Sequence, residues 1–325
     1  MDSNVGLKSS NIIEFVLPTP FLVGPVNVYL VKSEALTLVD AGPKTEEAWE
    51  SFTMQLKETG YSPNDIEQIV VTHHHPDHVG LLDRFPNSRI IGHKNNEKWL
   101  IRDNAFLQYV ILYFEQFYQE NGLPQRLIEK IKRQLQLYMN FSCQRELDII
   151  VKEGDCIDGL YGWNVVEVPG HAQSQIMLFN PSDKSAIAGD HLIQAISSNA
   201  LLEAPDKGSD RPKPLLQYRK ALQKLLDLET NIVYPGHGTP IKQAHELVTT
   251  RLKQQEKRAM GIYELLGGKE KTAFEIVQEL FPQKYEKQAD LTFSEVIGHL
   301  DLLEEENKVM KSVKDSIVFY RKSNE

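Results

Sequence analysis

The chain has 325 residues, of which 41% are hydrophobic, and a formal net charge of −9 at pH 7. This size and composition are typical of a globular protein with one large domain and a smaller one, and the acidic balance disfavours bulk binding of nucleic acid. Only two cysteines are present, Cys143 and Cys156, so no disulfide framework is implied, and neither belongs to a ligand-spaced pair; a reducing cytoplasm is expected. We expect neither an export signal nor a membrane anchor, because no basic and apolar signal succession begins the chain and no apolar run approaches about 20 residues.

Short apolar runs predict a strand-rich protein with one early helix. The expected helix covers residues 45–60, with Glu46 and Glu47 near its start and Gly60 at its end. The expected strands cover residues 12–17, 26–32, 35–39, 66–72, 147–151, 164–169, 176–180, 185–189 and 231–235. Periodicity alone indicates only a mixture of α and β structure.

Between about residues 95 and 145 the pattern becomes helical, with an interruption at residues 121–124. Large apolar residues recur here at three- and four-residue spacing and form one helical face: Phe106, Tyr109, Val110, Tyr113, Phe114 and Phe117. Such a face packs on the protein core or caps an apolar substrate pocket, and the two roles are compatible.

The last part of the chain predicts three helices, at residues 251–266, 272–281 and 292–306, and then a short pair of strands that ends at residues 316–320. This succession could bind DNA if its third helix were basic. The third helix is instead acidic: it contains Glu295, Asp301, Glu304, Glu305 and Glu306. Because these charges would repel phosphates, we expect a structural or homodimer-forming tail that does not bind duplex DNA.

The most informative segment runs from Thr72 to His78 and contains four histidines and an aspartate. It follows a β-branched run, so its side chains should lie on the loop at the end of a strand. From this loop His73, His75, Asp77 and His78 can turn inward, whereas His74 is expected to point away. Imidazole nitrogen suits zinc and iron, and the carboxylate lets a second ion share the loop. The alternative is an exposed polar loop with a fortuitous histidine cluster.

Three further candidate ligands follow apolar segments later in the chain. His171 and His237 each follow a Pro-Gly pair, and Asp190 follows a glycine. Glycine lets the backbone approach closely, so the side chain after it can reach a common centre. One Pro-Gly-His is weak evidence, but together with the upstream cluster the set indicates a metal site.

In this order the residues resemble the metallo-β-lactamase superfamily, whose pattern is His-x-His-x-Asp-His, then a single His, an Asp and a last His. The resemblance covers about residues 11–245. It implies an α+β fold, an αββα sandwich with a helical insertion and a small winged-helix-like C-terminal domain. The implied domains are residues 1–249, with the insertion at about 95–145, and residues 250–325.

The resemblance also implies two divalent metal ions, with Zn²⁺ expected first and Mn²⁺ or Fe²⁺ as alternatives. Carried over by position, one ion would bind His73, His75 and His171, and the other Asp77, His78 and His237, with Asp190 as the bridge. Many β-lactam-hydrolysing members have a cysteine where Asp190 stands, so the chain looks more like the glyoxalase II, lactonase and phosphodiesterase branches. Asp40 matches an acidic residue of the family, which would orient a ligand or form a plain turn.

The implied activity is hydrolysis of a small ester or thioester, as in glyoxalase II-like enzymes, with Asp77 or Asp190 orienting the nucleophile and assisting proton transfer. A second hypothesis is an endoribonuclease or phosphodiesterase, which the acidic balance disfavours. A third is a metal-sensing interaction module, which the complete ligand set disfavours. His191 could contact substrate or serve as a structural polar residue.

Overall fold

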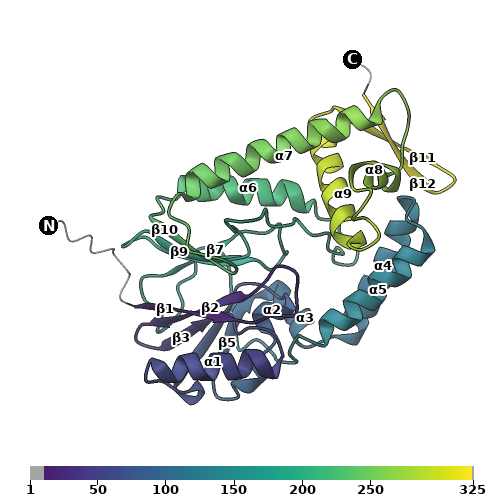
Figure 1. Ribbon diagram of the computed structural model, residues 1–325. Helices are drawn as coiled ribbons and strands as arrows, with labels where there is room; N and C mark the ends of the chain where they lie inside the picture. The colour runs from purple at the N-terminus through teal and green to yellow at the C-terminus, as the bar shows by residue number, and fades with distance from the viewer. Residues whose placement is uncertain (1–10, 324–325) are drawn as a thin grey trace.

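Two β-sheets lie face to face in the computed structural model, which describes residues 11–323 (Figure 1). The first sheet has its strands in chain order: β1 (Ile12–Leu17), β2 (Val26–Lys32), β3 (Leu36–Val39), β4 (Gln68–Val71), β5 (Arg89–His93) and β6 (Ile149–Val151). The second sheet has the order β10 (Ile232–Pro235), β9 (Ser185–Gly189), β8 (Ile176–Asn180), β7 (Asn164–Glu167). Strands β3 to β6 are parallel, and β9 pairs in parallel with β10, so several strands end at the same edge of the sandwich.

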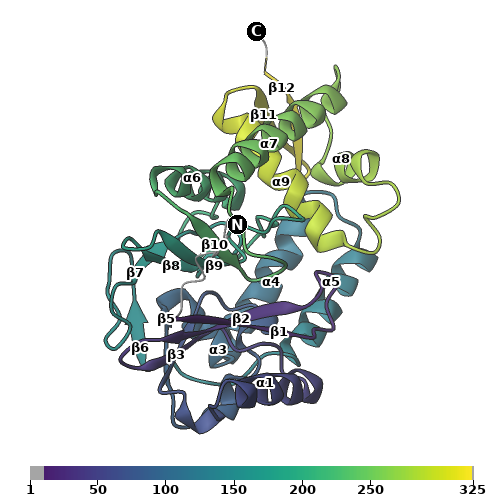
Figure 2. The same cartoon turned by 60° about the vertical axis from the view of Figure 1, so that its left-hand side comes forward.

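The α-helices lie outside the sheets and in two helical regions. They are α1 (Glu46–Glu58), α2 (Pro76–Val79), α3 (Glu97–Leu100), α4 (Asn104–Glu120), α5 (Gln125–Met139), α6 (Pro214–Asp227), α7 (Ala244–Leu266), α8 (Ala273–Leu280) and α9 (Ala289–Glu305). Helix α1 covers the outer face of the first sheet, and α6 and α7 cover the second, as Figures 1 and 2 show.

Each layer of the sandwich has its own apolar contacts. Val70 of β4 and Leu178 of β8 belong to the core between the sheets. Phe52 of α1 packs in a second core on the outside of the first sheet, and Leu222 of α6 in a third on the outside of the second. Because β4 is covered on both faces, all its residues are buried, which explains the apolar run that follows Gln68.

The predicted αββα sandwich is confirmed, and β1, β2, β8 and β9 have the predicted bounds. Asp77 and His78 were expected on a loop, but they lie in the short helix α2, which starts at Pro76 because proline presets the helical φ angle. Strand β5 and helix α6 were not predicted. The residues Leu215, Tyr218, Leu222 and Leu225 of α6 are buried at helical spacing, a signal that the sequence did contain.

The helical insertion, α3 to α5, packs against the C-terminal helices rather than only on the sandwich. The rings of Tyr118 on α4 and Phe293 on α9 meet at 5.1 Å between centroids, and Phe114 and Phe117 pack on the same cluster. The Tyr320 hydroxyl of the last hairpin also donates to Asn121 Oδ1 at the end of α4. We call this shared cluster the insertion–tail core; its existence favours the packing role of the aromatic face for Phe114 and Phe117.

Beyond the sandwich, α7, α8, α9 and the antiparallel hairpin of β11 (Val309–Lys314) and β12 (Ile317–Lys322) follow in the predicted order. The proposed domain boundary at residue 250 falls inside α7, which runs from the sandwich into the tail (Figure 1). The division into domains and the winged-helix likeness stay predictions. Among residues 11–323, no helix combines the length and apolarity that crossing a membrane requires.

Candidate metal centre

The candidate ligands meet at the edge of the sandwich where parallel strands end. His73 and His75 follow β4, Asp77 and His78 lie in α2, and His171, Asp190 and His237 come after β7, β9 and β10. Three groups have ligand atoms within 4.8 Å of one another: His73, His75 and His171; Asp77, His78 and His237; and His73, His78 and Asp190. The structure therefore brings together all seven residues that the sequence indicated, although they are up to 164 positions apart.

The first group consists of three imidazoles whose nitrogens face one another. His75 Nδ1 lies 2.9 Å from both His73 Nε2 and His171 Nε2. The far nitrogen of His171 contacts the carbonyl oxygen of Asn199 at 2.9 Å, and since a carbonyl only accepts, that nitrogen carries the proton. The Nε2 atom of His171 therefore carries no proton, and its lone pair points toward the His75 ring.

The same reasoning applies to His73. Its Nδ1 contacts the hydroxyl of Thr72 at 3.0 Å, and that hydroxyl already donates to Asp40. The hydroxyl must then accept from His73, which leaves His73 Nε2 without a proton. His75 can donate to only one of its two neighbours, so lone pairs remain opposed at 2.9 Å, an arrangement that a cation would stabilise.

The second group combines imidazole with carboxylate. His237 Nε2 lies 3.3 Å from Asp77 Oδ2 and 3.5 Å from Asp190 Oδ2, and its Nδ1 donates to the carbonyl of Pro25. His78 Nε2 lies 3.4 Å from Asp190 Oδ1. The buried Nε2 atoms of both histidines and Oδ1 of Asp190 have no hydrogen-bond partner among the described residues. Unpartnered N and O atoms in this arrangement fit a divalent transition metal.

Asp40 holds the metal-facing loop from behind. Its carboxylate accepts from the amide and the hydroxyl of Thr72 and from His78 Nδ1, at 2.7 to 2.8 Å. The residue has a left-handed backbone with φ 62°, an uncommon conformation that this network stabilises. Asp40 therefore orients the candidate ligand His78 and is more than a plain turn residue.

Burial and neighbouring charges separate the two groups electrostatically. Burial and the neighbouring imidazoles hold the pKa of His73 and of His75 well below the usual histidine value. Burial also opposes protonation of His237, but the carboxylates of Asp190 and Asp77 outweigh it and raise the pKa of His237 to about 10. The first group thus offers neutral nitrogen ligands. In the second group the carboxylates favour a proton on His237, and a divalent cation bound there would take the place of that proton.

The glycine before His237 is required because its backbone passes close to Asp190 and His78. A Cβ atom on this residue would lie 2.2 Å from Asp190 Oδ1 and 2.8 Å from His78 Cε1. The backbone of Gly236 also donates to the carbonyl of Gly189, which joins the two ligand-bearing turns. Only a residue without a side chain allows this close approach.

Two other histidines near the centre point elsewhere. The His74 ring stacks on Trp99 with 4.6 Å between centroids, and its Nδ1 contacts the Ser174 hydroxyl, so it points away as expected. His191 is fully buried against the ring of Tyr218 and belongs to none of the three groups. Its position favours the structural role over substrate contact.

Comparisons with known proteins agree with this geometry. The family model of the metallo-beta-lactamase superfamily matches residues 22–237. A Bacillus subtilis (strain 168) protein named "Probable metallo-hydrolase YqjP" is 42% identical over 316 residues, which cover 97% of this chain and 99% of the relative.

Solved structures of the same fold cover almost the whole chain. Metallo-beta-lactamase family protein TTHA1429 from Thermus thermophilus is 26% identical, with a TM-score of 0.78 over 96% of this chain and 98% of that one. A beta-lactamase domain protein from Burkholderia ambifaria, 20% identical with a TM-score of 0.76 over 96% and 92% of the two chains, shows the fold alone. The family model and the Bacillus relative show that this chain belongs to the metallo-beta-lactamase superfamily.

Proposed function

We propose that this chain is a metal-dependent hydrolase of a small ester or thioester that holds two divalent ions. The observation that carries the proposal is the pairing of two adjacent donor groups, one of three neutral imidazoles and one rich in carboxylate, around Asp190. Zn²⁺ suits both groups, and Mn²⁺ or Fe²⁺ are the alternatives. The name of the Bacillus relative, a metallo-hydrolase, supports the same class of reaction.

Each donor group would hold one of the two ions. His73, His75 and His171 would hold one ion, and Asp77, His78 and His237 the other, with Asp190 between them. Ions bound in this way lower the pKa of water to near neutrality and polarise the attacked group. Asp77 and Asp190 would orient the nucleophilic water through their carboxylate oxygens, accept its proton and release that proton to the leaving group.

Metal analysis and a substrate panel test the proposal together. Carefully purified protein should contain about two equivalents of metal per chain, one for each donor group. The metal-loaded protein should then hydrolyse acyl thioesters or lactones faster than a phosphodiester or single-stranded RNA. The matched variant Asp190→Asn keeps the size of the side chain and should lose turnover.

Three outcomes would contradict this proposal. A stable stoichiometry of one ion, unchanged by added zinc, manganese or iron, would exclude the dinuclear site. Faster cleavage of the phosphodiester or the RNA would favour the nuclease hypothesis. Full metal loading with no turnover of any substrate would favour the metal-sensing module.

A further inference from the structure

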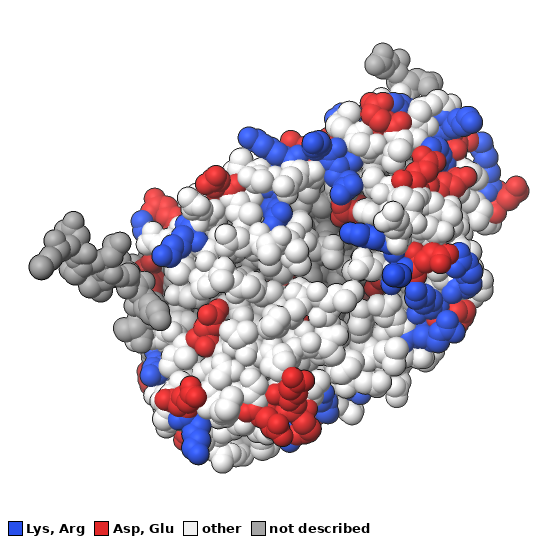
Figure 3. All heavy atoms as spheres, in the orientation of Figure 1, with Lys and Arg blue, Asp and Glu red and all other residues white. Residues whose placement is uncertain are grey.

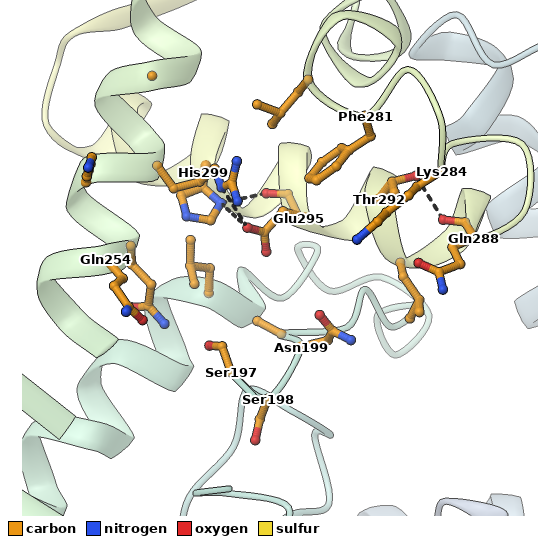
Figure 4. Close-up of a pocket in the computed structure, with 18 residues that line it drawn as sticks. Ser197, Ser198, Asn199, Gln254, Phe281, Lys284, Gln288, Thr292, Glu295 and His299 are labelled. Carbon is orange, nitrogen blue, oxygen red and sulfur yellow. Dashed lines mark hydrogen bonds and ion pairs between the residues drawn. The ribbon is translucent and has the colours of Figure 1, made fainter. Parts of the chain in front are cut away.

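A cavity of about 580 Å³ lies between the sandwich and the C-terminal helices. Helix α7 and helix α9 form two of its walls, the loop after α8 forms a third, and residues 197–200 form the side toward the sandwich (Figure 4). Its size is within the range of small-molecule sites, and both apolar and polar side chains line it. No residue that we place in the metal centre lines this cavity.

The cavity has an excess of positive charge in an acidic protein. Its lining includes the cations Lys257, Arg258 and Lys284 but a single acid, Glu295, which already pairs with Arg258 Nε at 3.4 Å. Among residues 11–323, the ammonium groups of Lys257 and Lys284 have neither an ion-pair nor a hydrogen-bond partner. Figure 3 shows Lys and Arg side chains gathered around the hollow in the upper half of this face. Two unpaired ammonium groups at one opening attract an anion.

His299 adds a specific acceptor to this charge. The residue is 2% exposed, its ring lies on the wall of the cavity (Figure 4), and its Nε2 has no hydrogen-bond partner in the part of the chain that the structure describes. Its Nδ1 donates to the Glu295 carbonyl at 2.7 Å, and burial lowers the pKa of the imidazole despite the nearby Glu295 carboxylate. A neutral ring with a protonated Nδ1 presents a bare Nε2, which accepts a hydroxyl or N–H donor.

The cavity also touches the support of the metal centre. Asn199 lines it, and the backbone carbonyl of the same residue accepts from Nδ1 of His171. A molecule in the cavity that contacts Asn199 would therefore touch the residue whose carbonyl orients His171. Phe281 and Leu291 contribute apolar surface to the lining of the cavity.

We propose that this cavity binds a small molecule that carries a phosphate or carboxylate group, a hydroxyl or N–H donor, and an apolar or planar part. Lys257 and Lys284 hold the anion, His299 Nε2 accepts from the donor, and Phe281 packs on the planar part. The ligand is either a distal portion of the metal centre's substrate or a separate effector.

Calorimetric titration of the metal-loaded protein tests the site with adenosine 5′-monophosphate as the probe and adenosine as its uncharged match. We expect the monophosphate to bind at least about tenfold more tightly than adenosine, a difference of about 1.4 kcal/mol. The double variant Lys257→Ala/Lys284→Ala should lose this preference. The control, Lys253→Ala/Lys287→Ala, removes two exposed lysines that are close to Lys257 and Lys284 in the sequence but do not line the cavity, and it should bind as the wild type does.

The variant His299→Phe tests the acceptor and should weaken both probes by a similar factor. If this buried change prevents folding, the exposed lysine pairs still decide the question. Equal monophosphate affinity in the two double variants would place the anion elsewhere, for example at the metal centre, and overturn the proposal. Absence of monophosphate binding would overturn it as well.

Kinetics then distinguish the two sources of the ligand. If the cavity holds part of the substrate, the Lys257→Ala/Lys284→Ala variant should raise KM for an anionic thioester and leave a small neutral ester unaffected. If it holds an effector, the monophosphate should change turnover of the neutral ester in the wild type but not in this variant. Calorimetry reports binding without turnover, so failure of the proposed hydrolase function would not be confused with failure of this site.

Discussion

The metal centre and the insertion–tail core are stabilised in opposite ways. In the candidate metal centre, polar side chains from separate turns converge. Four of the five imidazoles, all but that of His75, are oriented by a carbonyl, a hydroxyl or the Asp40 carboxylate. In the insertion–tail core, aromatic rings of α4 and α9 bury apolar surface, and polar contacts are few. The first region depends on the exact placement of atoms and the second on the area that is buried. Substitutions in the candidate metal centre should therefore lower activity and leave the protein folded. Substitutions in the insertion–tail core should lower the free energy of unfolding and leave metal binding unchanged.

The largest effect should come from Asp190→Ala. This change removes the carboxylate between the two donor groups and should lower kcat/KM by about 10³-fold or more, which is at least about 4 kcal/mol of transition-state stabilisation. Metal content and circular dichroism should show lost metal in a folded protein. The control is Asp183→Ala, an exposed aspartate before the other end of β9. Undiminished turnover with both ions bound would show that Asp190 does not bridge them.

Gly236→Ala should damage the same centre by steric means alone. Its Cβ would have to displace Asp190 Oδ1 from 2.2 Å, so metal affinity should fall by about 10- to 100-fold, as for other changes to residues that position ligands. Gly261→Ala is the matched control, because among residues 11–323 its new Cβ would meet no heavy atom within 4 Å other than those of its two chain neighbours and the surrounding backbone of its own helix. Competition with a chromophoric chelator measures both. Equal affinities would mean that the turn adapts freely.

Among the changes outside the candidate metal centre, Asp301→Ala on α9 should lower the free energy of unfolding most. Asp301 is 1% exposed and accepts two hydrogen bonds from Arg211 at 2.6 and 2.8 Å. The loss of one partner of a buried pair leaves the other charge uncompensated, so the free energy of unfolding should fall by about 3–5 kcal/mol. Glu286→Ala breaks the exposed pair with Arg126 and should cost about 1 kcal/mol or less. Urea denaturation compares them, and a loss of metal from folded Asp301→Ala protein would contradict the separation of the regions.

Phe117→Ala should have a smaller effect on stability and separates the two roles of the aromatic face. Phe117 contacts Phe293 in the insertion–tail core, so its truncation should lower the free energy of unfolding by about 2 kcal/mol and leave acyl-chain selectivity unchanged. Tyr113 is stacked on Phe117 but lies outside that core, so Tyr113→Ala should shift the selectivity ratio more than stability. The reverse pattern would give Phe117 the pocket role.

The smallest effect concerns acid stability. Burial lowers the pKa of His74 to about 3, so between that value and about 6.5 the unfolded chain binds one more proton than the folded chain. Stability should therefore fall as the pH falls below about 6.5, by about 1.4 kcal/mol per pH unit from this residue. His74→Gln should remove that share between pH 6.5 and 5.5 in thermal unfolding with saturating zinc. Metal release should affect the wild type and the His74→Gln variant equally. An identical pH dependence of stability in the two proteins would therefore contradict the lowered pKa of His74.

The proposals on partners and compartment need separate measurements. The acidic residues of α9 include Glu304 and Glu305, whose carboxylates lie within 3.8 Å of Lys213, so part of this charge is engaged within the chain. We still propose that the chain forms a homodimer, does not bind duplex DNA and lies in the cytoplasm, as the sequence suggested. Anisotropy titration at low salt and light scattering address the first two.

The sandwich and most of its strands could be predicted from the sequence, and the structure brings together the candidate ligands that the sequence indicated. Strand periodicity is local, and the His-x-His-x-Asp-His run places four donors within six residues, so neither needs long-range information. Helix α6 could have been found in the same way from the spacing of Leu215, Tyr218 and Leu222. Strand β5 has only two large apolar residues, Ile90 and Ile91, which lie between an arginine and a glycine, and so short an apolar run does not indicate a strand.

Only the tertiary structure decided how distant parts meet. No local pattern could show that Phe117 lies against Phe293, because contacts between helices 176 positions apart depend on how both pack on the sandwich. The same holds for the cavity, where Lys257, Lys284 and His299 come from three segments whose sequences show no shared motif. His299 belongs to no motif in the sequence that would have indicated a binding role. Its bare Nε2 matters because folding removes water from the ring and leaves the acceptor facing a cavity.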